Sequence, residues 1–206
     1  MSGAFPISTA KFGTLGIKSI QNTIISQSVS GKRLVRQIDN QRWAFSVQII
    51  TAKRSDVYGE LMAFIVKQRG QKETFTIIPP ELEDARGNEA GTVLIDGVHA
   101  VGDTTILMNG FGADGAGRFK AGDFLKFASH SKVYMVVEDV TSSSNAATVT
   151  IEPPLLIALV NDSVVTYDNI PFTVSLTTDV QEFGVSGADK DGNLYYEYQF
   201  DVEEAL

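Results

Sequence analysis

Two proline pairs mark the strongest discontinuities in this sequence. Pro79-Pro80 follows the β-prone run Thr76-Ile77-Ile78, and Pro153-Pro154 follows the similar run Thr150-Ile151-Glu152. Proline has no backbone N–H to donate to a β-ladder, so each pair should end the strand that precedes it. The chain is therefore expected to consist of three successive β-rich segments.

The composition changes at the first proline pair. Residues 81–91 are polar and acidic and carry turn signals, which is typical of a linker between domains. The strand pattern that resumes after the second pair needs partners, and the first part of the chain has strands to offer. We therefore expect residues 1–80 and 159–206 to form one discontinuous domain, with residues 81–158 inserted as a second.

The pattern of apolar residues favours a mainly β fold. Trp43, Phe45, Val47 and Ile49 alternate with more polar residues, so one face of that strand should lie on a core. Short strands are expected throughout the inserted segment and after it: Thr92–Ile95, Thr104–Met108, Phe124–Phe127, Lys132–Glu138, Ala147–Ile151, Val164–Val165, Phe172–Leu176, Gln181–Val185 and Tyr196–Val202. This spacing predicts a β-sandwich for the discontinuous domain and a small β-barrel for the inserted one.

One helix is predicted. Ser55 offers a side-chain oxygen as a cap, and Val57, Leu61 and Ile65 follow with helical spacing up to a stop at Gly70. Gly59 should weaken the interior of this helix by about 1 kcal/mol relative to alanine. The helix is therefore expected to depend on packing against the sheet.

Charge is distributed unevenly along the chain. Residues 1–80 have a net charge of +7, residues 81–158 of -6 and residues 159–206 of -9. The opposite charges either neutralise each other within one domain or meet between neighbouring subunits. In the second case the candidate interface residues are Lys32, Arg33, Arg36 and Arg42 on the basic side, and Glu197, Asp201 and Glu203 on the acidic side.

Several chemical functions are disfavoured. The chain has no cysteine, which excludes disulfides and thiolate sites. The string Gly110–Gly115 has the spacing of a dinucleotide-binding loop, but a strand pattern follows it where that motif needs a helix. His99 and His130 lack metal-ligand spacing, and no serine lies in a nucleophile elbow. We therefore expect no cofactor, no bound metal and no enzymatic activity.

The inserted segment carries three aromatic residues whose role the sequence leaves open. Phe111, Phe119 and Tyr134 either fill the core of the small barrel or lie exposed, where they would stack on sugar rings of a host-surface glycan. The second alternative describes a carbohydrate-binding module. The acidic isoelectric point, near 4.7, disfavours a nucleic-acid-binding protein. No transmembrane span or signal peptide is expected.

The first 80 residues resemble the distal tail proteins of long-tailed bacteriophages. The resemblance is carried by the strands Leu15–Ile20 and Arg42–Val47, by the helix ending Ala63–Gln71, and by Phe75 and Pro79-Pro80. It implies a tail-fold core and an inserted barrel of the oligonucleotide/oligosaccharide-binding (OB) type. Tail-tube, terminator and other minor tail proteins share parts of this pattern and remain alternatives.

The resemblance also implies a place in the virion. Such a protein would form a homohexameric ring at the distal end of the tail tube, with the tube protein on one side and the baseplate hub, tail tip and fibre proteins on the other. It would be made in the host cytoplasm, and DNA would touch it only in passage through the channel. An acidic strand Tyr195–Glu204 lining that channel would repel DNA phosphate.

Overall fold

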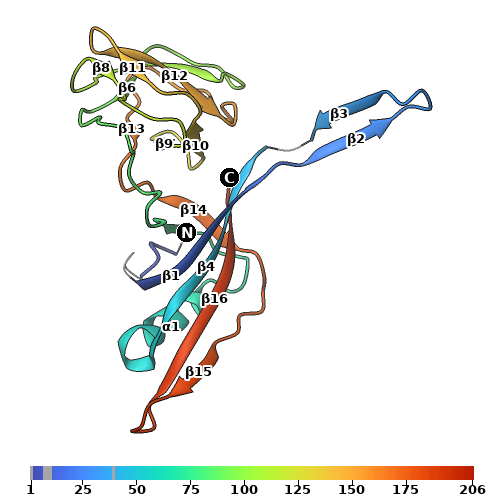
Figure 1. Cartoon of the computed structure of the whole chain (residues 1–206), viewed down its shortest axis with the longest axis vertical. Helices are drawn as coiled ribbons and strands as arrows, with labels where there is room; N and C mark the ends of the chain where they lie inside the picture. Colours follow the sequence, from blue (N-terminus) through green and yellow to red (C-terminus); the bar gives the residue numbers. More distant parts are fainter. Residues whose placement is uncertain (1, 7–10, 39) are drawn as a thin grey trace.

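The computed structural model describes residues 2–6, 11–38 and 40–206 of the chain. The fold is mainly β, as predicted, and consists of a long sheet, a barrel-like sheet and a projecting two-stranded arm (Figure 1). Within the described ranges there is one α-helix, and no helix is long and apolar enough to cross a bilayer.

The long sheet joins the two ends of the chain. Its strand order is β1-β4-β16-β14-β5, with β15 pairing to β16, and every pairing is antiparallel. The strands are β1 (Phe12–Ile20), β4 (Arg42–Lys53), β5 (Phe75–Ile77), β14 (Phe172–Leu176), β15 (Gly184–Ala188) and β16 (Leu194–Glu204). Strands from before Pro80 and after residue 170 therefore share one sheet.

The alternation in β4 places its apolar residues on the core face. Phe45, Val47 and Ile49 are almost completely buried, and Phe200 and Val202 of β16 lie opposite Val47 and Phe45. Helix α1 packs on the same cluster. Burying a large apolar side chain contributes about 1.5 to 3 kcal/mol, so this layer supplies much of the stability of the sheet.

The helical segment differs from its prediction at the start. A π-helical turn, η2 (Arg54–Tyr58), leads into α1 (Gly59–Lys67), and no side chain caps either one. The predicted Ser55 cap is wrong, because the Ser55 hydroxyl bonds the Asp56 carboxylate instead. The wider π turn brings the Arg54 carbonyl so close that a Cβ on Gly59 would lie 2.9 Å from its oxygen. Glycine is thus required at this junction.

The second sheet is a nearly closed barrel. Its order is β13-β9-β10-β12-β7-β6, and a bridge between Leu94 and Val164 brings its first and last strands together. The strands are β6 (Leu94–Ile95), β7 (Thr105–Asn109), β9 (Phe124–Phe127), β10 (Val133–Val136), β12 (Ala146–Glu152) and β13 (Val165–Thr166), with the small pair β8 (Gly115–Ala116) and β11 (Thr141–Ser142) beside them. Closure leaves few exposed strand edges.

The chain leaves the barrel later than the second proline pair predicted. Leu155, Leu159 and Tyr167 are buried in the barrel core, and β13 pairs with β9. Residues 159–167, assigned above to the discontinuous domain, therefore pack with the barrel, whereas Ile170 belongs to the core of the long sheet. Pro153 and Pro154 do end β12, but a proline marks the end of a ladder and not the end of a core. The division into two folding domains stays a prediction.

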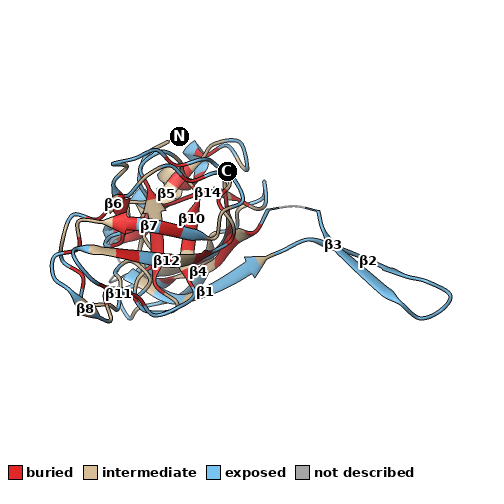
Figure 2. Cartoon of the chain, turned by 90° about the horizontal axis from the view of Figure 1, so that it is seen from above, coloured by how far each residue is buried: buried red, intermediate tan, exposed pale blue. Residues whose placement is uncertain are grey.

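The arm is formed by β2 (Thr23–Gln27) and β3 (Arg33–Gln37), which continue from β1 and lead back to β4. These two strands pair only with each other, in a separate two-stranded sheet. Two perpendicular views show the arm leaving the body on one side (Figures 1 and 2). All ten of its strand residues are exposed.

Candidate subunit interface

The arm exposes apolar side chains on both of its faces. Ile25 pairs with Val35 on one face, whereas Ile24 and Leu34 lie on the other, and each of the four is 53–58% exposed. A lone two-stranded hairpin is marginally stable in water, and exposed apolar strands of this kind indicate a protein partner. The arm is therefore the strongest candidate interface among the described residues.

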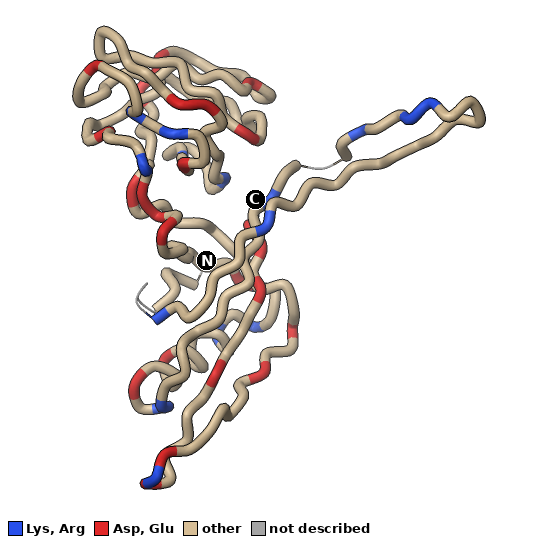
Figure 3. Tube along the Cα trace, in the orientation of Figure 1, with Lys and Arg blue, Asp and Glu red and all other residues tan. Residues whose placement is uncertain are grey.

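The arm is also basic. Residues 21–38 contain Lys32, Arg33 and Arg36 and no acidic residue. In Figure 3 the arm accordingly carries only positive segments, whereas negative ones gather on the body. The prediction that Lys32, Arg33 and Arg36 form an interface stays untested, and their position on the projecting arm agrees with it.

The other predicted interface residues lie on the polar face of the long sheet. Arg42 pairs with Glu203 at 2.8 Å, and Asp201 accepts a hydrogen bond from Ser46, so both carboxylates have partners in their own chain. Glu197 lines a shallow pocket on the same face with Glu182 and Gln199. The fold therefore brings Arg42 to Glu203 but separates the arm cations from all three acidic candidates.

A groove lies where the start of β1 meets the linker that follows β5. Its volume is about 370 Å³, and we call it the linker groove. It is lined by Phe12, Gly13, Thr14, Leu15, Ile17, Pro80, Glu81 and Leu82. Five of these eight residues are large and apolar or proline, and β1 presents an outer strand edge beside them. Such an edge is open to pairing with another chain.

The linker that borders this groove is crowded with negative charge. Burial and the neighbouring Asp84 raise the pKa of Glu83 above its ordinary value. Burial, with Asp84 again contributing, also raises the pKa of Asp168. Arg86 does not relieve the crowding, because its guanidinium bonds Asp123 at 3.2 Å. The acidic linker was visible in the sequence, but nothing there showed that it borders a groove.

A buried polar network holds the barrel on the long sheet. The ammonium of Lys132 in the barrel bonds the carboxylate of Glu204 and the side-chain oxygen of Gln41. Glu204 also accepts hydrogen bonds from the amides of Val133 and Trp43, at 2.8 and 3.2 Å. Lys132 and Glu204 are far apart in sequence and lie in no motif, so sequence reasoning missed this network.

The three aromatic residues proposed above as outer-surface contacts lie inside the barrel. Phe119 and Tyr134 are fully buried and Phe111 is 4% exposed. Phe119 packs against both Phe111 and Tyr167, and the Tyr134 hydroxyl accepts a hydrogen bond from the Leu156 amide. Of the two alternatives, the structure supports core filling and rules out exposed outer-surface contacts, because Tyr134 of β10 and the loop residues Phe111 and Phe119 all fill the barrel interior.

The glycine-rich string holds a carboxylate of its own chain. Glu89, whose side chain is buried, accepts hydrogen bonds from the amides of Gly91 and Gly112 at 2.6 and 2.7 Å. A Cβ on Gly110 would lie 2.2 Å from the Thr92 carbonyl oxygen. The glycines therefore allow close backbone packing around Glu89, and their amides are not offered to a phosphate.

The two histidines take part in separate hydrogen-bond arrangements. His99 accepts a hydrogen bond from the Leu107 amide at 3.2 Å. His130 bonds the hydroxyl groups of Ser129 and Tyr134 at 2.9 and 2.8 Å. Among the described residues no cluster of three or more possible metal ligands is found.

Comparison with known families bears on the barrel. Residues 82–170 match the family model of distal tail protein pb9, B domain. The match covers the barrel, the linker before it and the residues up to 170 after it, and it leaves the strands of the long sheet and the arm outside. It supports a structural role in a bacteriophage tail, as a component of the virion, over an enzymatic one. No curated protein matches the chain.

Proposed function

We propose that this chain is a distal tail protein that forms a homohexameric ring at the end of a long phage tail. The long sheet builds the ring, and the barrel, of the OB type, faces outward. The ring joins the tail tube protein to the baseplate hub, and the tip and fibre proteins attach to it. The match to a distal tail protein domain supports this assignment for the barrel.

The observation that carries the proposal is the arm. A hairpin with apolar side chains on both faces, whose strands pair with no other strand among the described residues, is suited to a contact repeated from copy to copy. A contact between this projecting arm and a different surface of the next copy is heterologous, and a heterologous contact forms a ring when its rotation closes. No catalytic group is required for this role.

The polar face of the long sheet is the surface proposed to line the channel. Glu197, Asp201 and Glu203 share this face along β16. Their negative charge keeps DNA phosphate from adhering during passage. DNA is then a transient neighbour and not a ligand.

Native mass spectrometry of the purified chain tests the proposal. A species of six copies is expected, and a variant in which residues 24–36 are replaced by a short Asn-Gly turn should remain monomeric. The matched control inserts the same turn after Asp191 in the β15–β16 hairpin and should assemble normally. A chain that stays monomeric at every concentration and does not bind tail tubes would contradict the proposal.

A further inference from the structure

We infer that the arm of one copy docks in the linker groove of the next copy, with its cations on the acidic linker. This inference rests on the proposed function, because it names the partner of the surface that builds the ring. Both halves of the contact come from the same chain, so a single heterologous contact is specified.

Both the arm and the linker groove present apolar side chains to the proposed contact. The groove offers Phe12, Leu15 and Leu82, which are partly buried against the core of the long sheet and keep part of their surface toward the groove. Ile17 is 39% exposed beside them. A face of the arm presents either the pair Ile25 and Val35 or the residues Ile24 and Leu34. Burying these side chains against each other removes apolar surface from water on both copies.

The arm and the linker carry opposite charges. Glu81 lines the groove, and Glu83 and Asp84 follow it within four residues. Burial, together with repulsion from Asp84, raises the pKa values of Glu83 and Asp168. Arg33 and Arg36 belong to opposite faces of the arm, so each face carries one arginine beside its apolar patch. An arriving guanidinium relieves the crowding of the linker carboxylates, and this favours one orientation of docking.

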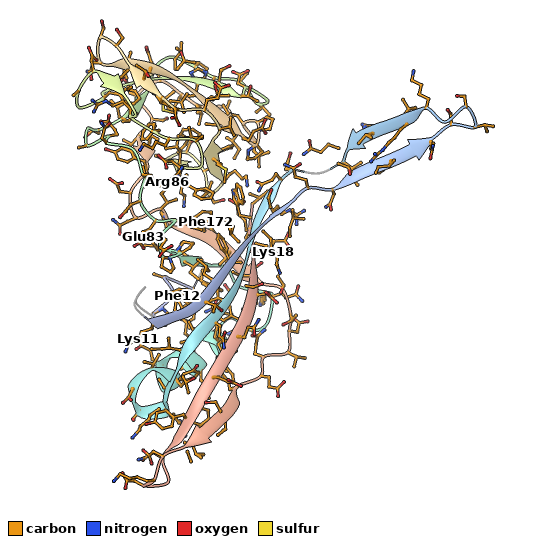
Figure 4. The ribbon with its side chains drawn as sticks, in the orientation of Figure 1. Lys11, Phe12, Lys18, Glu83, Arg86 and Phe172 are labelled. Atoms are coloured by element: carbon orange, nitrogen blue, oxygen red, sulfur yellow. The ribbon has the colours of Figure 1, made fainter. Side chains whose placement is uncertain are left out.

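The geometry matches a ring. Figure 4 places Phe12 and Glu83 on the side of the body that faces away from the arm. A head-to-tail contact needs its two complementary surfaces on different sides of the subunit. The acidic residues of β16 serve less well as the receptor, because Glu203 and Asp201 already bond Arg42 and Ser46.

Cysteine cross-linking tests the contact directly, since the chain has no cysteine of its own. Ile17→Cys is mixed with Leu34→Cys or Val35→Cys, which lie on opposite arm faces, and the mixture is oxidised. A disulfide-linked dimer is expected with one of the two arm variants. The matched control pairs the same arm variants with Val185→Cys on β15, which is more exposed than Ile17 (52% against 39%), and should give no dimer.

Charge reversal provides the second test. Arg33→Glu with Arg36→Glu, or Glu81→Lys with Glu83→Lys, should each weaken assembly at least tenfold, and the four changes together should restore it. Glu138→Lys with Glu152→Lys is the acidic control, on exposed positions of the barrel outside the proposed contact, and should leave assembly unchanged.

The outcomes separate the two proposals. In one outcome, rings form while neither arm cysteine links to Ile17→Cys and while Glu81→Lys with Glu83→Lys leaves assembly unchanged. That result overturns the docking site but leaves the proposed ring intact. If the unaltered chain does not assemble, the proposed function itself fails, and the docking site fails with it.

Discussion

The pair formed by Lys132 and Glu204 is the most consequential contact at the scale of single residues. Their side chains are 1% and 0% exposed, and they join strands of two different sheets. Burial lowers the pKa of Lys132, against the attraction of Glu204. A buried ion pair adds little net stability, but removal of one partner leaves the other charge buried without compensation.

Lys132→Met should therefore destabilise the protein by about 3 to 5 kcal/mol. Adding Glu204→Gln should recover part of that loss, because glutamine is neutral, although its single side-chain oxygen can accept only one of the hydrogen bonds that the Trp43 and Val133 amides donate to Glu204. Urea unfolding measures both effects. A cost below about 1 kcal/mol for Lys132→Met would contradict the importance of the pair.

His130 makes the stability depend on pH. Burial first, and then the nearby charges of Lys126 and Lys132, lower its pKa below the ordinary value of 6.5. The unfolded chain then binds the proton more readily than the folded one, so stability falls as the pH drops from about 7 through 6.5 and levels off below the folded pKa.

His130→Gln should flatten this part of the pH profile. Thermal unfolding between pH 8 and pH 5 measures the slope, and Ser129→Ala is the matched control, because it removes a hydrogen bond of His130 but keeps its titration. Equal slopes in the His130→Gln variant and the unaltered chain would exclude His130 as the titrating group.

At the scale of elements, Gly59 shows how the sequence can be misread. An exchange of glycine for alanine inside a helix normally gains about 1 kcal/mol. Here the added Cβ would meet the Arg54 carbonyl at 2.9 Å, so Gly59→Ala should lose about 1 to 2 kcal/mol instead. Val66→Ala, on the exposed face of α1, is the control and should gain a few tenths of a kcal/mol. Stabilisation by Gly59→Ala would contradict the close approach.

The strands could be predicted from the sequence where one face is buried. In β4 the residues Trp43 to Ile49 alternate because one side meets a core and the other meets water. The same logic located Ala147–Ile151 of the barrel, where Ala147, Val149 and Ile151 are buried in alternation. Periodicity records which face is covered, so elements of this kind are found reliably.

The arm and the barrel boundary could not be found in this way. The sequence has the same high β-propensity whether its apolar residues are buried in a core or exposed for contact with another chain, as in the arm residues Ile24, Ile25, Leu34 and Val35. The site residues suffer from a related ambiguity, because Phe111 and Tyr134 look alike as core residues and as a sugar platform. Only the pairing of strands distant in sequence settles these questions.

At the scale of the whole molecule, the question is whether the sheet and the barrel behave as one body. Phe124 and Val133 of the barrel belong to the core of the long sheet, where Phe124 packs edge-on against Trp43 at 5.2 Å and against Phe172 at 5.6 Å. The Trp43 indole also donates to the Val133 carbonyl at 2.9 Å. A core shared in this way couples the unfolding of its two parts.

The chain should therefore unfold in a single transition, and its composition supplies the probe. Trp43 is the only tryptophan in the sequence and lies at the junction, so its fluorescence reports on the contact between sheet and barrel. Far-ultraviolet circular dichroism reports on the strands of both. The two transitions should coincide in urea, and Lys132→Met should separate them by loosening the junction before the sheets melt. In the unaltered chain, a fluorescence change at clearly lower urea than the change in circular dichroism would instead show a barrel that moves independently of the long sheet. A ring built from such subunits would carry its barrels on a hinge.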